Sequence, residues 1–381
     1  MSELGDQPGG DGPSSSAPVW AVGVAPLILA PLEGAVDADV CVIGLGGSGL
    51  SCIGELQRTG ARVVGIDAVT VGGGAAGRNG GFLLAGIASF HHEAADSHGR
   101  ERATRAWHLT LTELERIAAE TPAAVRRTGT LRIAIDDEEM ADCDAQLAAM
   151  TMDGLPVERY DGWEGRGLLF PQDASFQPLL RCREIARRVI TNGAHLFEHS
   201  PSLAIGRGEV TTPRGMVRAP ITIVAVDGGL ERALPELVGR VRSVRLQMVG
   251  TAPASDVHYE RPVYSRYGLD YWQQLADGRI ALGGFRDVGG DSEWTLDAKP
   301  SAAVQRALEQ CLRERVRTIA PITHRWAALV AYTPDGLPVV EQVREGVWAT
   351  GAYNGTGNVV GALCGRAVAQ LAVSGRTELL L

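Results

Sequence analysis

Lysine is almost missing from this sequence of 381 residues: Lys299 is the single lysine, and arginine supplies all other permanently basic side chains. Covalent catalysis through a lysine, or a phosphate-binding loop of the G-K-S/T type, needs a lysine in an apolar or glycine-rich setting. Lys299 lies instead in the polar stretch 297–300. The sequence therefore excludes these lysine-dependent classes.

Cysteine is also sparse, and the spacing of the cysteines does not match a metal-binding motif. The six cysteines include no C-x-x-C pair and have no histidine at ligand spacing, so we predict reduced thiols, a cytoplasmic protein and no metal site. The apolar stretch 17–32 is short and rich in proline, and residues 1–6 lack the cationic start of a secretory signal. We expect neither export nor contact with a membrane.

Positive charge is in short supply overall. Lys and Arg number 36 against 45 Asp and Glu, which gives a formal net charge of −9. No basic stripe is available to neutralise phosphates, so nucleic acid is not an expected partner. What the chain does have is 45% hydrophobic residues and 48 glycines, enough for a large core and for two interlocked domains.

The order of the apolar segments predicts an α/β fold. Residues 1–16 are mostly Gly, Pro, Ser and acidic residues, which is typical of a disordered tail. A buried strand is expected at 39–43, a helix at 50–56 and a second strand at 61–67, which together form a parallel β-α-β unit. Helices are expected at 101–121, 179–189 and 302–320, and several short strands lie between them. The C-terminal part repeats the pattern of strand, glycine loop and helix over 346–373.

The loop between the first strand and helix reads G-x-G-x-x-G at 44–49. In this position the first glycine permits a tight turn, the second lets the backbone approach a pyrophosphate, and the third lets helix and strand pack closely. The N-terminus of the helix supplies N–H groups and partial positive charge to the phosphates. Asp67 ends the second strand, where a carboxylate accepts hydrogen bonds from a ribose. The unit predicts a dinucleotide-binding site.

A second glycine-rich loop at 72–81 is too long for a simple turn. Together with the strand at 278–284, the T-P-D-G-L-P segment at 333–338 and the G-A-Y-N-G-T-G motif at 351–357, it resembles the D-amino-acid oxidase-like family of FAD-dependent oxidoreductases. This family includes glycine oxidase, sarcosine oxidase and γ-glutamylputrescine oxidase. The resemblance extends from about residue 38 to about residue 372, and the motifs occur in family order.

This resemblance implies FAD as the cofactor and a fold that combines two domains. A Rossmann-like FAD-binding domain with a parallel sheet would comprise 37–95, 168–228 and 321–381, and an antiparallel-sheet substrate domain would comprise 96–167 and 229–320, after an N-terminal extension, partly disordered, at 1–36. The positions that correspond to FAD contacts are Gly44, Gly46, Gly47, Ser48, Gly49, Asp67, Ala68, Gly74, Ala75, Arg78, Asn79, Gly80, Gly81, Ser202, Ala225, Gly228, Gly351, Asn354, Gly355, Thr356, Gly357 and Asn358.

The departures from the family pattern concern the substrate and the electron acceptor. Val330 stands where glycine oxidase-like members carry a carboxylate-binding arginine, and Asn358 or Val359 stands where sarcosine oxidase-like members carry a lysine. Ala281 replaces the lysine that promotes reaction with oxygen, which leaves the acceptor open. Ala328 replaces the cysteine of covalent attachment, so we expect non-covalent FAD.

The candidate catalytic residues are Arg286, Tyr353 and His91. The family resemblance implies that Arg286 and Tyr353 contact the substrate, and His91 follows the flavin loop in the sequence. His91 and its neighbour His92 also fit an ordinary surface pair, and the aromatic residues at 267, 271 and 272 fit either an active-site wall or core packing. The predicted function is oxidation of the C–N bond of a small-molecule amine or N-substituted amino acid. A dehydrogenase with a quinone or protein acceptor and a non-catalytic FAD-binding partner stay open as alternatives, as does a homo-oligomer.

Overall fold

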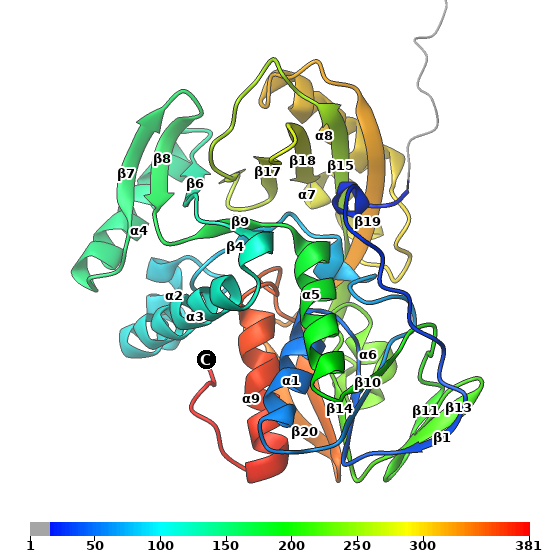
Figure 1. Ribbon diagram of the computed structural model, residues 1–381. Helices are drawn as coiled ribbons and strands as arrows, with labels where there is room; N and C mark the ends of the chain where they lie inside the picture. Colours follow the sequence, from blue (N-terminus) through cyan, green and yellow to red (C-terminus); the bar gives the residue numbers. More distant parts are fainter. Residues whose placement is uncertain (1–15) are drawn as a thin grey trace, which may run out of the picture.

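A computed structural model describes residues 16–381 (Figure 1). Its lower half is built on a six-stranded sheet in the order β10-β3-β2-β14-β21-β20. All neighbouring pairs are parallel except β20 with β21 at one edge. The strands are β2 (Val40–Ile43), β3 (Val63–Ile66), β10 (His195–Phe197), β14 (Ile221–Val224), β20 (Val339–Arg344) and β21 (Val347–Gly351).

Three helices cover one face of this sheet: α1 (Gly47–Gln57), α5 (Pro178–Thr191) and α9 (Val360–Ser374). α1 contacts both of the others. Its apolar residues Leu50, Ile53 and Leu56 are buried against the strands. Because β2 and β3 are covered on both faces, they are continuously apolar instead of alternating, as expected for a parallel sheet.

The upper half is an eight-stranded sheet in the order β19-β15-β18-β17-β16-β6-β8-β7. Every pair is antiparallel except β16 with β6. The amphipathic α8 (Ala302–Glu314) packs on it through Val304, Leu308 and Leu312. The strands are β6 (Thr130–Ile133), β7 (Glu158–Gly162), β8 (Gly165–Phe170), β15 (Arg242–Pro253), β16 (Val263–Ser265), β17 (Asp270–Gln274), β18 (Arg279–Gly284) and β19 (Ile322–Tyr332).

Smaller elements join the two halves. A three-stranded sheet, β4-β9-β5, carries the chain between them, and a four-stranded sheet, β1-β13-β12-β11, lies at the far end of the parallel sheet. The strands of these two sheets are β1 (Gly34–Asp37), β4 (Phe82–Leu83), β5 (Val125–Arg126), β9 (Ala174–Phe176), β11 (Ala204–Ile205), β12 (Glu209–Thr211) and β13 (Gly215–Arg218). Further helices are α2 (His91–His98), α3 (Arg100–Glu120), α4 (Asp137–Met152), α6 (Leu230–Ala233) and α7 (Arg286–Gly289).

The fold class predicted from the sequence is confirmed, with a parallel sheet and a largely antiparallel sheet in one chain. β19, within the segment 321–381 that we assigned to the FAD-binding domain, pairs with β15 in the eight-stranded sheet. The predicted domain limits stay a prediction. Of the N-terminal extension, residues 1–15 lie outside the described part. Between residues 16 and 381, no helix combines the length and apolar character that crossing a bilayer requires.

Candidate active site

The G-x-G-x-x-G loop joins β2 to α1 as expected. Gly44 has φ of 105°, and a β-carbon on it would lie 2.4 Å from the carbonyl oxygen of Ala225. A β-carbon on Gly49 would lie 1.9 Å from the carbonyl oxygen of Gly44. Both positions therefore need glycine for the turn itself. Gly46 has only Ala76 near its missing β-carbon, at 3.1 Å, so the space there is open to a ligand.

Asp67 follows β3 and supports this loop. Its carboxylate accepts hydrogen bonds from the backbone N–H of Leu45 at 2.7 Å and of Val69 at 2.9 Å. Burial raises the pKa of Asp67, opposed by these hydrogen bonds. A carboxylate oxygen accepts more than one hydrogen bond, so the same group can also accept from a ribose hydroxyl.

Arg181, on α5, is a candidate site residue that the sequence analysis missed. It is buried, and its Nε and Nη2 atoms have no hydrogen-bond partner within residues 16–381. Its Nη1 atom lies 2.9 Å from where a β-carbon on Gly47 would be, beside the first turn of α1. Burial lowers its pKa. Unpartnered guanidinium donors next to a helix N-terminus fit an anion. Together with the space at Gly46, they fit the pyrophosphate of FAD.

The second glycine-rich loop is fixed by hydrogen bonds from distant segments. Trp326 donates through Nε1 to the carbonyl oxygen of Arg78 at 2.7 Å, and Trp20 donates to that of Asn79 at 2.8 Å. The amide of Asn358 donates to Oδ1 of Asn79 at 3.2 Å. These contacts connect the loop to β19, the N-terminal segment and the start of α9, so its position depends on the whole fold.

A cavity of about 370 Å³ lies between this loop, the eight-stranded sheet and the segment before α9. It brings together nine of the predicted site residues, namely Ala75, Arg78, Asn79, Gly80, Arg286, Asn354, Gly355, Thr356 and Asn358. Eight aromatic side chains also line it, those of Phe82, Phe90, Trp107, Phe170, Tyr264, Tyr267, Tyr271 and Tyr332. Val330 and Ala328 also line it. An apolar cavity with a few convergent polar groups is typical of a small-molecule site.

Two candidate catalytic residues do not line this cavity. Tyr353 is buried and points to α1, where its hydroxyl donates to Oγ of Ser48 at 2.7 Å, and burial raises its pKa well above the usual range. His91 is buried behind Trp107 and pairs with Asp153 at 2.6 Å. Both side chains thus have partners away from the cavity wall, on α1 and just after α4, and their predicted catalytic roles stay a prediction.

Five further predicted FAD contacts lie near the ends of the parallel strands. Ala68 lies two residues after β3, Ala225 and Gly228 follow β14, and Gly351 ends β21. Ser202 lies in the loop after β10, at the edge of the same sheet. The carboxyl ends of adjacent parallel strands meet at one edge of a sheet, which is where ligands bind in open α/β folds. Their contacts with FAD stay a prediction.

Arg286 is an arginine of the cavity wall with no counter-ion among the described residues. It begins α7, and its guanidinium lies over the rings of Tyr332 at 4.8 Å and Trp294 at 5.5 Å. Within residues 16–381 it has no hydrogen-bonded or ion-paired side chain. The other lining cation, Arg78, donates instead to the carbonyl oxygens of Ala327 and Ser16. Arg286 is therefore the free cation of this cavity in the described part of the chain.

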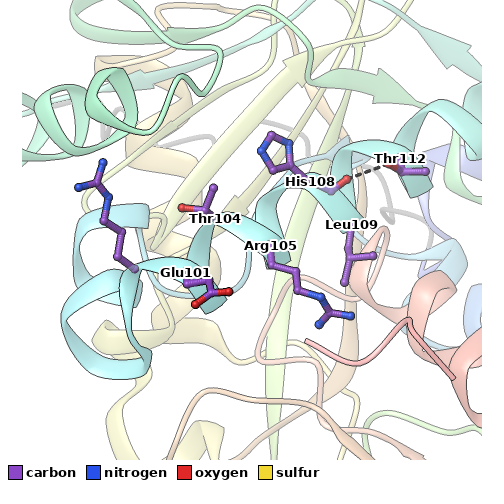
Figure 2. A pocket seen from close by; sticks show the side chains of 7 residues that line it. Glu101, Thr104, Arg105, His108, Leu109 and Thr112 are labelled. Atoms are coloured by element: carbon purple, nitrogen blue, oxygen red, sulfur yellow. Dashed lines mark hydrogen bonds between the residues drawn. The ribbon is translucent and has the colours of Figure 1, made fainter. Parts of the chain in front are cut away.

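A shallow hollow along α3 differs from this cavity. Figure 2 shows that its side chains all come from one helix: Glu101, Thr104, Arg105, His108, Leu109 and Thr112. The hydrogen bond drawn there runs from the hydroxyl of Thr112 to the carbonyl oxygen of His108, at 2.9 Å. Arg105 holds the C-terminal tail through the carbonyl oxygen of Leu380 at 2.6 Å. The residues that line this face all belong to α3, and we assign no reaction to it.

His92, Glu93 and Asp142 lie close enough together to share a cation. However, Asp142 already pairs with His92 at 3.0 Å and with Arg132. Because these partners neutralise the carboxylate, we assign no metal to this cluster.

The fold and the cavity define a flavin-dependent oxidoreductase, and comparison with known proteins gives the family. The protein-family model described as FAD dependent oxidoreductase matches residues 39–371. The chain therefore belongs to this family, and FAD is its cofactor. The chain is 24% identical to the probable oxidoreductase OrdL of Haemophilus influenzae, over 92% of this chain and 86% of that protein. It is 26% identical to γ-glutamylputrescine oxidoreductase of Escherichia coli, over 89% of this chain and 84% of that protein.

Solved structures agree on the fold. Glycine oxidase from Geobacillus kaustophilus superposes with a TM-score of 0.73 at 19% sequence identity, over 90% of this chain and 96% of that one. At this level of identity the likeness concerns the fold alone. The family resemblance expected from the motifs is confirmed, and the protein is an FAD-dependent oxidoreductase.

Proposed function

We propose that this enzyme oxidises the C–N bond of an amine or N-substituted amino acid that carries an anionic group some distance from the oxidised carbon. FAD, when bound, would supply the acceptor for a hydride from the carbon beside a neutral amine. Water would then hydrolyse the imine product to a carbonyl compound and an amine. The relative named γ-glutamylputrescine oxidoreductase supports the substrate class.

The observation that carries the proposal is the unpaired Arg286 in a cavity without the usual carboxylate anchors. Val330 lines the cavity where glycine oxidase-like members have arginine, and Asn358 lines it where sarcosine oxidase-like members have lysine. A carboxylate buried beside a flavin needs a paired cation, because an unpaired buried charge costs several kcal/mol. Arg286 lies at the edge formed by Tyr332 and Trp294. Its place favours an anionic group far from the reacting carbon.

The chain itself orients the substrate and excludes water. The aromatic walls desolvate the amine, and Asn358 fixes the start of α9 against the loop by donating to the carbonyl oxygen of Phe82 at 2.8 Å. The N-terminus of a helix favours negative charge, such as that which develops on a reduced flavin. Orientation and electrostatic support therefore supply the acceleration, without a general base from this chain.

Anaerobic flavin reduction tests the proposal. Glycine and D-alanine should reduce the flavin slowly, whereas an amine with a distal carboxylate, such as an N-alkylated amino acid, should reduce it quickly. Arg286→Ala should raise the concentration for half-maximal reduction by about tenfold or more, the equivalent of about 1.4 kcal/mol. Arg242→Ala is the matched control, because Arg242 stacks on the same Trp294 ring at 4.2 Å but does not line the cavity.

Rapid reduction by glycine, unchanged in Arg286→Ala, would contradict the proposal. Reoxidation of the reduced enzyme by oxygen and by a soluble quinone then separates an oxidase from a dehydrogenase. Ala281, where the resemblance implies a lysine in oxygen-reactive members, is fully buried. Reoxidation by the quinone faster than by oxygen would identify a dehydrogenase.

A further inference from the structure

Asp173 is a buried carboxyl group in the wall of the cavity that the reaction proposed above does not use. It lies in the turn between β8 and β9 and is 4% exposed. One carboxyl oxygen accepts from the N–H of Ala85 at 3.0 Å, and the other accepts from the hydroxyl of Thr130 at 2.7 Å. Within residues 16–381 it has no ion-pair partner.

The nearest arginine along β6 is already engaged. Arg132, two residues beyond Thr130, is ion-paired with Asp142 and donates to Oε1 of Gln146 at 2.5 Å. Its guanidinium also lies over the ring of Phe90 at 3.5 Å. Asp173 is therefore left without a compensating charge by the described side chains. Since burial of a lone charge is costly, such a carboxyl group is suited to a cation that arrives with a ligand.

Aromatic rings stand on the same wall. The rings of Trp107 and Phe170 have centroids 6.2 Å apart, and those of Phe170 and Tyr264 are 6.3 Å apart. All three residues line the cavity with Asp173, whose backbone N–H donates to the carbonyl oxygen of Phe170 at 3.3 Å. Faces of aromatic rings attract ammonium groups, most strongly where water is excluded. The carboxyl group of Asp173 and the three aromatic rings are therefore the kinds of group that bind an organic cation.

We propose that Asp173, with Trp107, Phe170 and Tyr264, binds a second, cationic amine of the substrate. The inference rests on the proposed function and extends it: the substrate carries the amine to be oxidised, an anionic group for Arg286 and an ammonium group for Asp173. Burial raises the pKa of Asp173 to about 7, which agrees with a carboxyl group that awaits a positive partner.

A pair of inert probes tests the site on the FAD-loaded enzyme. The tert-butylammonium ion and tert-butanol have the same shape, differ in charge and have no hydrogen on the substituted carbon, so neither can be oxidised. Titration followed by the flavin absorption spectrum should show the ammonium ion bound at least about tenfold more tightly than the alcohol. Asp173→Asn should abolish this preference. Asp144→Asn, which removes an exposed carboxylate from α4, should retain it.

A second readout separates this inference from the proposed function. In the wild type, 1,4-diaminobutane should reduce the flavin at lower concentration than 1-aminobutane. Asp173→Asn should remove this difference, whereas Asp144→Asn should keep it. If no amine reduces the flavin but the ammonium probe still binds through Asp173, the proposed function fails and the cation site stands. Equal binding of the two probes to the wild type, or undiminished preference in Asp173→Asn, would overturn the site. If Asp173→Asn does not retain FAD, the wild-type probe comparison decides.

Discussion

At the residue scale, the glycines of the first loop serve two different purposes. Gly44 and Gly49 are required by the backbone, because a β-carbon on either would collide with a carbonyl oxygen. Gly46 has room for a β-carbon in the ligand-free chain, apart from a tight contact with Ala76. A substitution at Gly49 would therefore disturb folding, whereas one at Gly46 reports on the cofactor.

We expect Gly46→Val to fold but to purify without FAD, because its side chain occupies the space of the pyrophosphate. Gly46→Ala should retain less FAD than the wild type. Gly54→Ala, on the same helix, is the control, because its added β-carbon makes only an ordinary contact with Val189 at 3.9 Å. The flavin content per chain and the circular dichroism spectrum measure the outcome. A Gly46→Val protein with full FAD would remove the loop from the cofactor site.

Ala328 makes a prediction about attachment. It lines the cavity at the position where the resemblance implies a cysteine for covalent flavin in other members, and the six cysteines are all buried elsewhere. Acid precipitation of the yellow protein should therefore release all flavin into the supernatant as FAD. Colour that stays with the pellet would show a covalent bond.

Asp173 predicts how stability depends on pH in the absence of a ligand. Its pKa is raised from the usual 3.8 to about 7 by burial. Its carboxyl group accepts hydrogen bonds from the N–H of Ala85 and the hydroxyl of Thr130, and the phenol of Tyr264 lies nearby. Below about pH 4 the group is protonated in both states and contributes nothing. As the pH rises to about 7, the unfolded chain gives up the proton first, so the folded state loses stability.

The variant Asp173→Asn should be free of this loss. Its free energy of unfolding relative to that of the wild type should thus rise between about pH 4 and about pH 7. Urea unfolding midpoints at the two pH values measure the difference. A constant difference between variant and wild type would show that Asp173 ionises normally in the folded protein.

At the scale of elements, the N-terminal segment before β1 belongs to the site. Trp20 is 1% exposed, packs with Met248, Ala281 and Trp326, and donates to the loop at Asn79. The sequence analysis assigned residues 1–36 to a partly disordered N-terminal extension and expected the disorder in residues 1–16, which are mostly Gly, Pro, Ser and acidic residues. The structure around Trp20 comes from burial against distant elements, which composition does not reveal.

Trp20→Ala should lower the free energy of unfolding by about 3 to 5 kcal/mol, as expected for removal of a buried tryptophan. It should also weaken FAD retention, since the loop at Asn79 loses a hydrogen-bond donor. Trp163→Ala is the control, because that side chain is 52% exposed. Denaturant titration and flavin content measure both effects. Unchanged FAD retention in Trp20→Ala would show that this segment stabilises the fold without supporting the site.

The difference between local sequence patterns and burial by distant elements explains which features the sequence could predict. The β-α-β unit and the glycine loops are local patterns, and the structure has them where expected. Asp173, Arg181 and Trp20 escaped notice because each resembles an ordinary loop, helix or tail residue until the fold buries it. Tyr353 and His91 were placed beside the substrate by proximity in sequence to flavin motifs, but their side chains point to Ser48 and Asp153.

At the scale of the whole molecule, the proposed FAD site is built from segments that are far apart in the chain. The loops at 44–49 and 72–81 and residues 225–228 and 351–358 follow or precede strands and helices from distant parts of the chain. FAD should therefore stabilise the complete fold, because it binds the folded state and not the unfolded one. At about 100 times the dissociation constant this amounts to about 2.7 kcal/mol.

Thermal unfolding of the apoprotein should accordingly shift to higher temperature by several degrees as FAD is added, and the shift should grow with the concentration of FAD. Gly46→Val should show no such shift. A wild-type melting temperature independent of added FAD would indicate that the cofactor site is preformed by only part of the chain, without coupling to global unfolding.

The position of β21 and α9 has a consequence for biosynthesis. β21 lies inside the parallel sheet between β14 and β20, and α9 packs on α1, although they are separated from β2 and α1 by about 300 residues of sequence. Until the ribosome has made the last segment, the edge of β14 that pairs with β21 is exposed and α1 lacks its neighbour α9. At about 5–20 residues per second this state lasts for many seconds, so the nascent chain must be kept from aggregating until its C-terminus is released.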